Sequence, residues 1–93
     1  MKIVINRCYG GFSLSDFAVH KLGLYSAYDY IPRDDPNLIS LIETYGPEKV
    51  GNPHYTALKI VQIPAEATDW IIEDYDGMER IGYVLYGKIW YTS

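Results

Sequence analysis

The spacing of hydrophobic residues changes along the chain from that of a strand to that of a helix and back. The first apolar run, residues 2–8 (KIVINRC), is short, rich in β-branched residues and followed by glycines, which predicts a buried strand. Residues 56–63 (TALKIVQI) form a second such run with apolar side chains on both faces, and Pro64 ends it. The second strand is therefore expected to be partly covered on both faces.

Residues 14–22 have the period of an amphipathic helix. Ser13 is the expected N-cap, and Asp16 stands three residues later in a capping-box arrangement. Phe12 precedes the cap and is expected to pack on Phe17 as a hydrophobic staple. Gly23 ends the helix. The apolar stripe consists of Leu14, Phe17, Ala18 and Leu22.

A second helix is predicted at residues 36–45. Asp35 is its expected N-cap, Pro36 takes the first helical position, and Gly46 with Pro47 stops it. Apolar residues recur at helical spacing at Leu38, Leu41, Ile42 and Tyr45. The tyrosine-rich stretch between the helices and residues 48–55 (EKVGNPHY) are expected to be irregular.

The last third of the chain predicts an antiparallel meander. Residues 69–75 and 78–85 are strand-like and are joined by Asp76-Gly77, a strong two-residue hairpin signal. Tyr86-Gly87 marks a second turn, into KIWYT. The whole chain, residues 1–93, then reads β-α-α-β-β-β, with KIWYT as one further strand. This order predicts one two-layer α+β domain, with two helices on one face of a small mixed or antiparallel sheet and its first two strands side by side and parallel.

Composition and charge narrow the class of protein. With 48% hydrophobic and 22% charged residues in 93, the chain is expected to fold as one domain. Its net charge of −4 argues against direct binding to nucleic acid. A single cysteine excludes an internal disulfide and fits a reducing cytoplasm. We expect neither a signal peptide nor a membrane span, because no apolar run is long enough.

The corner after the first strand, CYGGFSLSD, is the first candidate site. A helix N-terminus stabilises a thiolate or another anion, so Cys8 could be an active thiol or the turn could hold a phosphate. The candidate ligand residues are Cys8, Tyr9, Gly10, Gly11 and Ser13. The alternative is a buried cysteine followed by a tight glycine turn. We predict no catalytic residue, because the sequence places neither histidine beside Cys8.

The second candidate is an acidic run that contains no basic residue before Arg80. Its members are Glu66, Asp69, Glu73, Asp74, Asp76 and Glu79. The spacing of a calcium loop is missing, and one cysteine with two distant histidines gives no zinc spacing, so no metal site is predicted. The run is expected to form a solvated outer hairpin face, which could also dock on a basic partner protein.

Aromatic residues on both faces of the last strands form the third candidate. A one-sided sheet needs fewer, so one face should need a cover. A symmetric homodimer would supply it, and the alternative cover is the segment that carries Tyr25, Tyr28 and Tyr30.

Four stretches resemble, in the same order, those of a group of small uncharacterised proteins encoded by bacteriophages and prophages. They are CYGGFSLSD (8–16), RDDPNLI (33–39), LKIVQIP (58–64) and EDYDGMERI (73–81). The C-terminal GYVLYGKIWYTS departs from the more charged ends of that group, which changes the expected partner surface. The resemblance implies no known activity. It implies a small accessory phage protein that binds a host component, such as a defence factor.

The sequence thus favours a non-catalytic protein without cofactor that binds and inhibits or redirects a host protein in the host cytoplasm. Its expected interface consists of Glu73, Asp74, Asp76, Glu79, Tyr83, Tyr86, Trp90 and Tyr91. The alternative is a small-ligand protein that holds a nucleotide-like anion at the Gly10-Gly11 turn.

Overall fold

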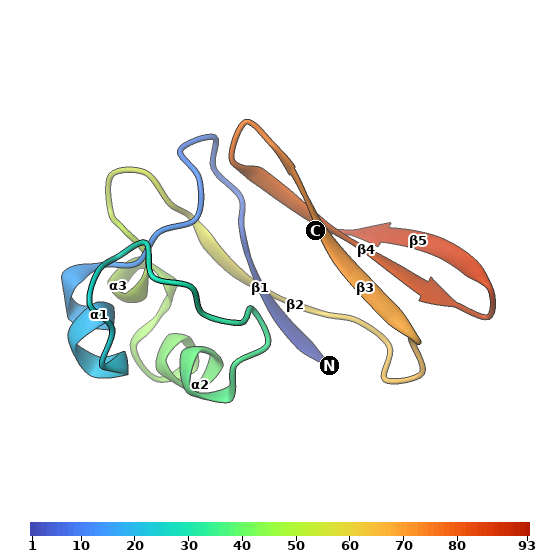
Figure 1. The fold of residues 1–93 in the computed structure, drawn as a ribbon, viewed down its shortest axis with the longest axis horizontal. Coiled ribbons are helices and arrows are strands. Elements are labelled where there is room, and N and C mark those ends of the chain that lie inside the picture. The colour runs from blue at the N-terminus through green and yellow to red at the C-terminus, as the bar shows by residue number, and fades with distance from the viewer.

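The helices and strands follow the order that the sequence predicts, with one short helix in addition. The computed structural model describes residues 1–93, and its elements are β1 (Lys2–Asn6), α1 (Asp16–Leu22), α2 (Pro36–Tyr45), α3 (Pro47–Val50), β2 (Leu58–Gln62), β3 (Asp69–Tyr75), β4 (Met78–Leu85) and β5 (Lys88–Thr92). The predicted α+β class is confirmed. Figure 1 shows β1 and β2 between the helices on one side and β3, β4 and β5 on the other.

The five strands form two antiparallel sheets. β1 pairs with β2, from Lys2 opposite Gln62 to Asn6 opposite Leu58, and the last three strands form a separate meander. The first two strands therefore lie side by side in one sheet, as expected, but the expectation that they are parallel is wrong. The residues just before β2 are bound to the end of β1, since Arg7 N–H donates to the Ala57 carbonyl at 2.8 Å. β2 must then start where β1 ends.

Each face of the β1–β2 ribbon supports its own hydrophobic core, because side chains alternate along a strand. On the helical side, Val4 and Leu58 pack with residues from the helices and their loops, namely Leu14, Ala18, Ile31, Leu38, Ile42 and Val50. On the other side, Ile3 and Ile5 pack with Val61, Ile63 and Ile81. The prediction that the second strand is covered on both faces is confirmed, and the covers are the helices and the meander.

Helix α1 begins two residues later than predicted. Ser15, not Ser13, is the N-cap, and its hydroxyl accepts the N–H of Ala18 at 3.2 Å. Ser13 is buried and bonds to the Thr56 hydroxyl at 3.0 Å, so it belongs to the packing of the corner. Because the N-cap is Ser15, Phe12 and Phe17 do not occupy the two positions that a hydrophobic staple joins. Phe17 instead packs edge-on against Tyr45, with ring centroids 5.0 Å apart.

The local end signals of the helices are otherwise confirmed. Gly23 is left-handed, and the Leu24 N–H closes a Schellman bond on the Val19 carbonyl at 3.0 Å. Asp35 caps α2 by accepting the N–H of Leu38 at 2.9 Å. The segment expected to be a loop after Gly46 contains the one-turn helix α3, which Pro47 starts.

The meander matches its prediction strand by strand. β3 pairs with β4 around the Asp76-Gly77 turn, and β4 pairs with β5 around Tyr86-Gly87. All four turn residues have positive φ, as the two-residue turns of twisted hairpins require.

Candidate functional site

The Cys8 corner is a junction between three segments, and the buried Asn6 side chain joins them. The Asn6 Nδ2 group donates to the carbonyls of Cys8 and Gly77, both at 2.6 Å. The Asn6 Oδ1 atom accepts the N–H of Ala57 at 2.9 Å. One fully buried amide thus fastens the corner to the tip of the β3–β4 hairpin and to the start of β2.

The backbone packs closely on both sides of this corner. A Cβ atom at Gly10 would overlap the backbone of Tyr55, and one at Gly77 would lie 2.5 Å from the Gly11 nitrogen. Glycine is needed at these two positions because another backbone occupies the space of a side chain. The double glycine and the Asp76-Gly77 turn therefore pack against one another.

Three of the backbone amides that could hold an anion are bonded inside the protein. Ser13 N–H donates to the Thr56 hydroxyl at 3.1 Å, Leu14 N–H to the Ala27 carbonyl at 3.3 Å, and Ser15 N–H to the Val50 carbonyl at 2.9 Å. Asp16 adds a negative charge in the first turn of α1. Several donors of the expected cradle thus already have protein acceptors, which favours the structural interpretation of the corner.

Cys8 itself is half-buried, and its thiol makes no hydrogen bond with either histidine. Only its carbonyl takes part in the junction. We expect Cys8→Ala to change the free energy of unfolding by less than about 1 kcal/mol, as for other substitutions away from a buried network. Urea unfolding measures this change. If Cys8→Ala lowered the free energy of unfolding by several kcal/mol, the thiol would contribute to stability in a way that its contacts do not explain.

Glu79 lies inside the protein, which corrects the prediction that the whole acidic run is a solvated outer face. Its side chain is only 3% exposed and forms a bidentate ion pair with Arg33, at 2.6 and 2.8 Å. It also accepts the N–H of Asn6 at 2.7 Å. The Arg33 guanidinium lies 3.6 Å from the centroid of the Phe12 ring. The sequence pattern does not predict this ion pair, because its two residues are 46 positions apart in the chain.

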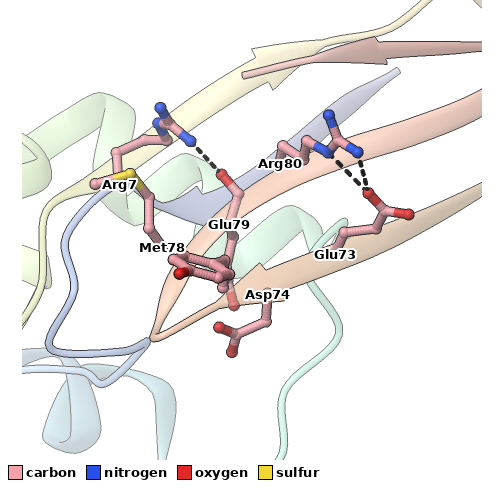
Figure 2. Close-up of a pocket in the computed structure, with 7 residues that line it drawn as sticks. Arg7, Glu73, Asp74, Met78, Glu79 and Arg80 are labelled. Atoms are coloured by element: carbon pink, nitrogen blue, oxygen red, sulfur yellow. Dashed lines mark hydrogen bonds and ion pairs between the residues drawn. The ribbon is translucent and has the colours of Figure 1, made fainter.

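A polar hollow of about 690 Å³ lies at the hairpin end of the meander (Figure 2). It is lined by Arg7, Glu73, Asp74, Tyr75, Met78, Glu79 and Arg80. Its charged groups have protein partners: Arg7 donates to the Glu79 carbonyl at 2.7 Å, and Arg80 binds Glu73 at 2.7 Å. Asp74 accepts the N–H of Gly77 at 2.6 Å and so stabilises the turn. These contacts indicate that the charged groups lining the hollow have a structural role.

We call the side of the meander that is turned away from β1 its outer face. It carries Asp69, Ile71, Glu73, Tyr75, Met78, Arg80, Gly82, Val84, Ile89 and Tyr91, as the strand register places them. Ile71, Ile89 and Tyr91 are 56%, 64% and 49% exposed. Near the middle, an apolar hollow of about 210 Å³ opens over Gly82, between Ile71, Val84 and Ile89. No helix or strand of the chain covers this face.

The predicted interface residues do not form one surface. Glu73 and Tyr91 lie on the outer face, whereas Tyr83 and Trp90 lie opposite each other on the inner face. Asp76 and Tyr86 occupy the turns at opposite ends of β4. Ile71 and Ile89 are not among the predicted interface residues, although the period of two places them on the same face as Glu73 and Tyr91.

The tyrosine segment between α1 and α2 does not cover the outer face. Tyr28 and Tyr30 line an open groove with Trp70 and Ile72, which point from β3 to the inner side. Both tyrosines and Tyr25 are exposed. The alternative cover considered for the surplus aromatic face is therefore not formed.

No three His, Cys, Asp or Glu side chains are grouped so that they could hold a metal ion. None of the helices has the length and apolar character needed to cross a lipid bilayer. Searches of protein-family models, curated proteins and solved structures found nothing that matches this chain.

Proposed function

We propose that this chain is a non-catalytic binding protein whose outer meander face docks on another protein. The observation that carries the proposal is the uncovered apolar surface of Ile71, Val84, Ile89 and Tyr91 on an otherwise well-packed fold. Contiguous apolar surface of this kind marks interaction sites in soluble proteins. The Cys8 corner, by contrast, is filled by the chain's own backbone.

The composition of the outer face fits a protein partner. Interfaces are rich in aromatic residues and arginine at their centre and polar at their rim. Here Arg80 lies 3.9 Å from the centroid of the Tyr91 ring and is neutralised by Glu73. The hollow over Gly82 offers a place for one apolar side chain of the partner.

The charge around this face favours a basic partner. Asp69 is exposed on this face and Asp76 is exposed in the turn at its end, and the chain carries a net charge of −4. Opposite charge on the partner would speed its association. The resemblance to phage-encoded proteins makes a host protein, such as a defence factor, the expected target, which the docked chain would block or redirect.

We also propose that the protein forms a homodimer. The support is the same surplus of exposed aromatic residues, since Trp90 and Tyr91 are each 49% exposed on opposite faces of β5. A symmetric dimer covers such surface with a copy of itself.

Ile71→Lys is expected to weaken target binding at least about tenfold, because it places a charge in the apolar centre of the docking face. Ile71 lies on β3, away from β5, so the oligomeric state should not change. The measurement is capture of a bacterial host protein by the immobilised chain, followed by titration of the captured protein.

Tyr25→Lys is the matched control, because Tyr25 is fully exposed on a different part of the surface. Circular dichroism confirms that both variants are folded. Equal binding of a host protein by wild type and Ile71→Lys would show that the outer face is not the docking surface. Failure of the wild type to retain any host protein would count against the binding function itself.

A further inference from the structure

The strand edges of this fold are protected unequally. The free edge of β1 is occupied, since Val4 N–H donates to the Arg33 carbonyl at 2.8 Å and Asn6 N–H donates to Glu79 at 2.7 Å. β2 carries one charge, Lys59, which is the second residue of the strand and is exposed. The occupied backbone groups of β1 and the charge on β2 both oppose pairing with another strand.

The two edges of the meander differ in the same respect. β3 carries three acidic residues, Asp69, Glu73 and Asp74, whose charges oppose pairing of its edge with another strand. β5 has a single charge, Lys88, at its first residue, and Lys88–Tyr91 are all exposed. Figure 1 shows β5 as the outermost strand, far from the helices. β5 is thus an exposed aromatic edge without an acidic residue, and its end lies near β2, where the Ser93 oxygen accepts a hydrogen bond from Lys59 Nζ at 2.9 Å.

The hairpin geometry identifies the free backbone groups of this edge. In a two-residue hairpin the pair that closes the turn is hydrogen-bonded, and the bonded pairs then alternate. The closing pair is Leu85 with Lys88, so Trp90 bonds to Tyr83 of β4. The N–H and carbonyl groups of Ile89 and Tyr91 therefore point away from β4, toward the open edge.

We propose that two copies of the chain pair through β5, antiparallel about a two-fold axis at Trp90, to form a six-stranded sheet. This inference rests on the proposed homodimer and specifies its strand and register. Residues that exchange hydrogen bonds across the two-fold axis must both point their backbone groups outward, and Ile89 and Tyr91 do so in the register centred on Trp90. Ile89 of each copy then exchanges both backbone hydrogen bonds with Tyr91 of the other.

The side chains of β5 are complementary to themselves in this register. Ile89 lies opposite Tyr91 on the outer face, an aliphatic–aromatic pair of the kind that stabilises sheets. On the inner face the two Trp90 rings lie side by side and extend the existing Tyr83–Trp90 pair into a row of four aromatic residues. Lys88 lies opposite Thr92, so no like charges face each other.

The same arrangement limits the assembly to two copies. A two-fold pair uses the same edge of both chains, so the acidic β3 strands become the two outer edges of the six-stranded sheet. Their charges oppose further strand addition. The outer faces of the two meanders also lie on one side of the sheet, which doubles the proposed docking surface.

Trp90 is the one residue that lies opposite itself, and this provides the test. Trp90→Lys or Trp90→Glu alone places two like charges side by side and should raise the dimer dissociation constant at least about tenfold. An equimolar mixture of the two variants should restore a dimer with one chain of each kind. With one of the two variants uniformly labelled with nitrogen-15, native mass spectrometry distinguishes the mixed dimer by mass, and sedimentation over about 1 μM to 1 mM gives the dissociation constants.

Tyr86→Lys is the matched control, because Tyr86 is an exposed aromatic in the turn outside the paired strand, and it should leave the dimer intact. A wild-type monomer throughout this concentration range would overturn both the homodimer and its register. A wild-type dimer that persists in Trp90→Lys and Trp90→Glu would overturn the β5 pairing but leave self-association standing. Two monomeric variants that do not form a mixed dimer would overturn the register centred on Trp90.

Discussion

Glu79→Ala is expected to lower the free energy of unfolding by about 3–5 kcal/mol, because it leaves Arg33 inside the protein without its counter-charge. The loss has a second source. The N–H of Asn6 donates to the same carboxylate and would remain buried without an acceptor. A loss of this size is a large fraction of the stability of a small domain, so the variant should be partly unfolded at room temperature.

Glu73→Ala is the matched control for this prediction. Glu73 also forms an ion pair with an arginine, but both side chains are at least 38% exposed. An exposed pair contributes about 1 kcal/mol or less. Urea unfolding followed by tryptophan fluorescence compares the two variants, and equal losses would show that burial of the Arg33–Glu79 pair does not set its importance.

A double substitution separates charge from packing at this site. Replacing both members of a buried ion pair by apolar residues of similar size avoids the isolated charge and is often neutral. We therefore expect Arg33→Met with Glu79→Met to regain part of the stability that Glu79→Met alone loses. The recovery should be incomplete, because Asn6 N–H still lacks its acceptor.

Gly77→Ala is the second substitution with a large expected effect. Gly77 has a φ of 90°, which costs an L-residue about 1–2 kcal/mol. Its new Cβ would also lie 2.5 Å from the Gly11 nitrogen and 2.6 Å from the Tyr9 carbonyl oxygen. Because both neighbours are backbone, the hairpin tip must move away from the corner, at a further cost of about 1–3 kcal/mol.

Gly87→Ala isolates the strain from the packing. Gly87 has a similar φ of 75° in the other two-residue turn, and a Cβ there has no neighbour within 4 Å. Gly87→Ala should therefore show the conformational cost alone, and thermal or urea unfolding of the two variants gives the difference. If Gly77→Ala costs no more than Gly87→Ala, the hairpin does not pack on the corner as described.

Sequence patterns predicted the elements whose signals are local. Asp35 with Pro36 and Gly46 with Pro47 define α2 because caps and breakers act within a few residues. The Asp76-Gly77 turn defines the first hairpin for the same reason. Local signals do not decide which of Ser13 and Ser15 is the N-cap of α1. Either can cap a helix, and the choice depends on Thr56, which binds Ser13 from 43 residues away.

The candidate site was less predictable because its decisive contacts are distant in sequence. Glu79 resembles the other acids of its run until Arg33 is placed beside it. The direction of β2 relative to β1 likewise depends on Asn6 and Arg7 binding the segment before β2. Sequence indicated that one aromatic face needs a cover, but which face stays open depends on where the β1–β2 ribbon packs.

The position of β1 also has a consequence for synthesis of the protein. The partners that bind the backbone edges of this strand all come much later in the chain: Val4 bonds to Arg33, Ile3 pairs with Val61, and Asn6 N–H donates to Glu79. During synthesis, the apolar residues Ile3–Ile5 would therefore leave the ribosome early and remain unpaired until most of the chain has been made. Contacts of such long range slow folding and leave apolar segments open to aggregation or chaperone binding. We expect nascent chains that end before β4 to remain unfolded and to be recognised by chaperones.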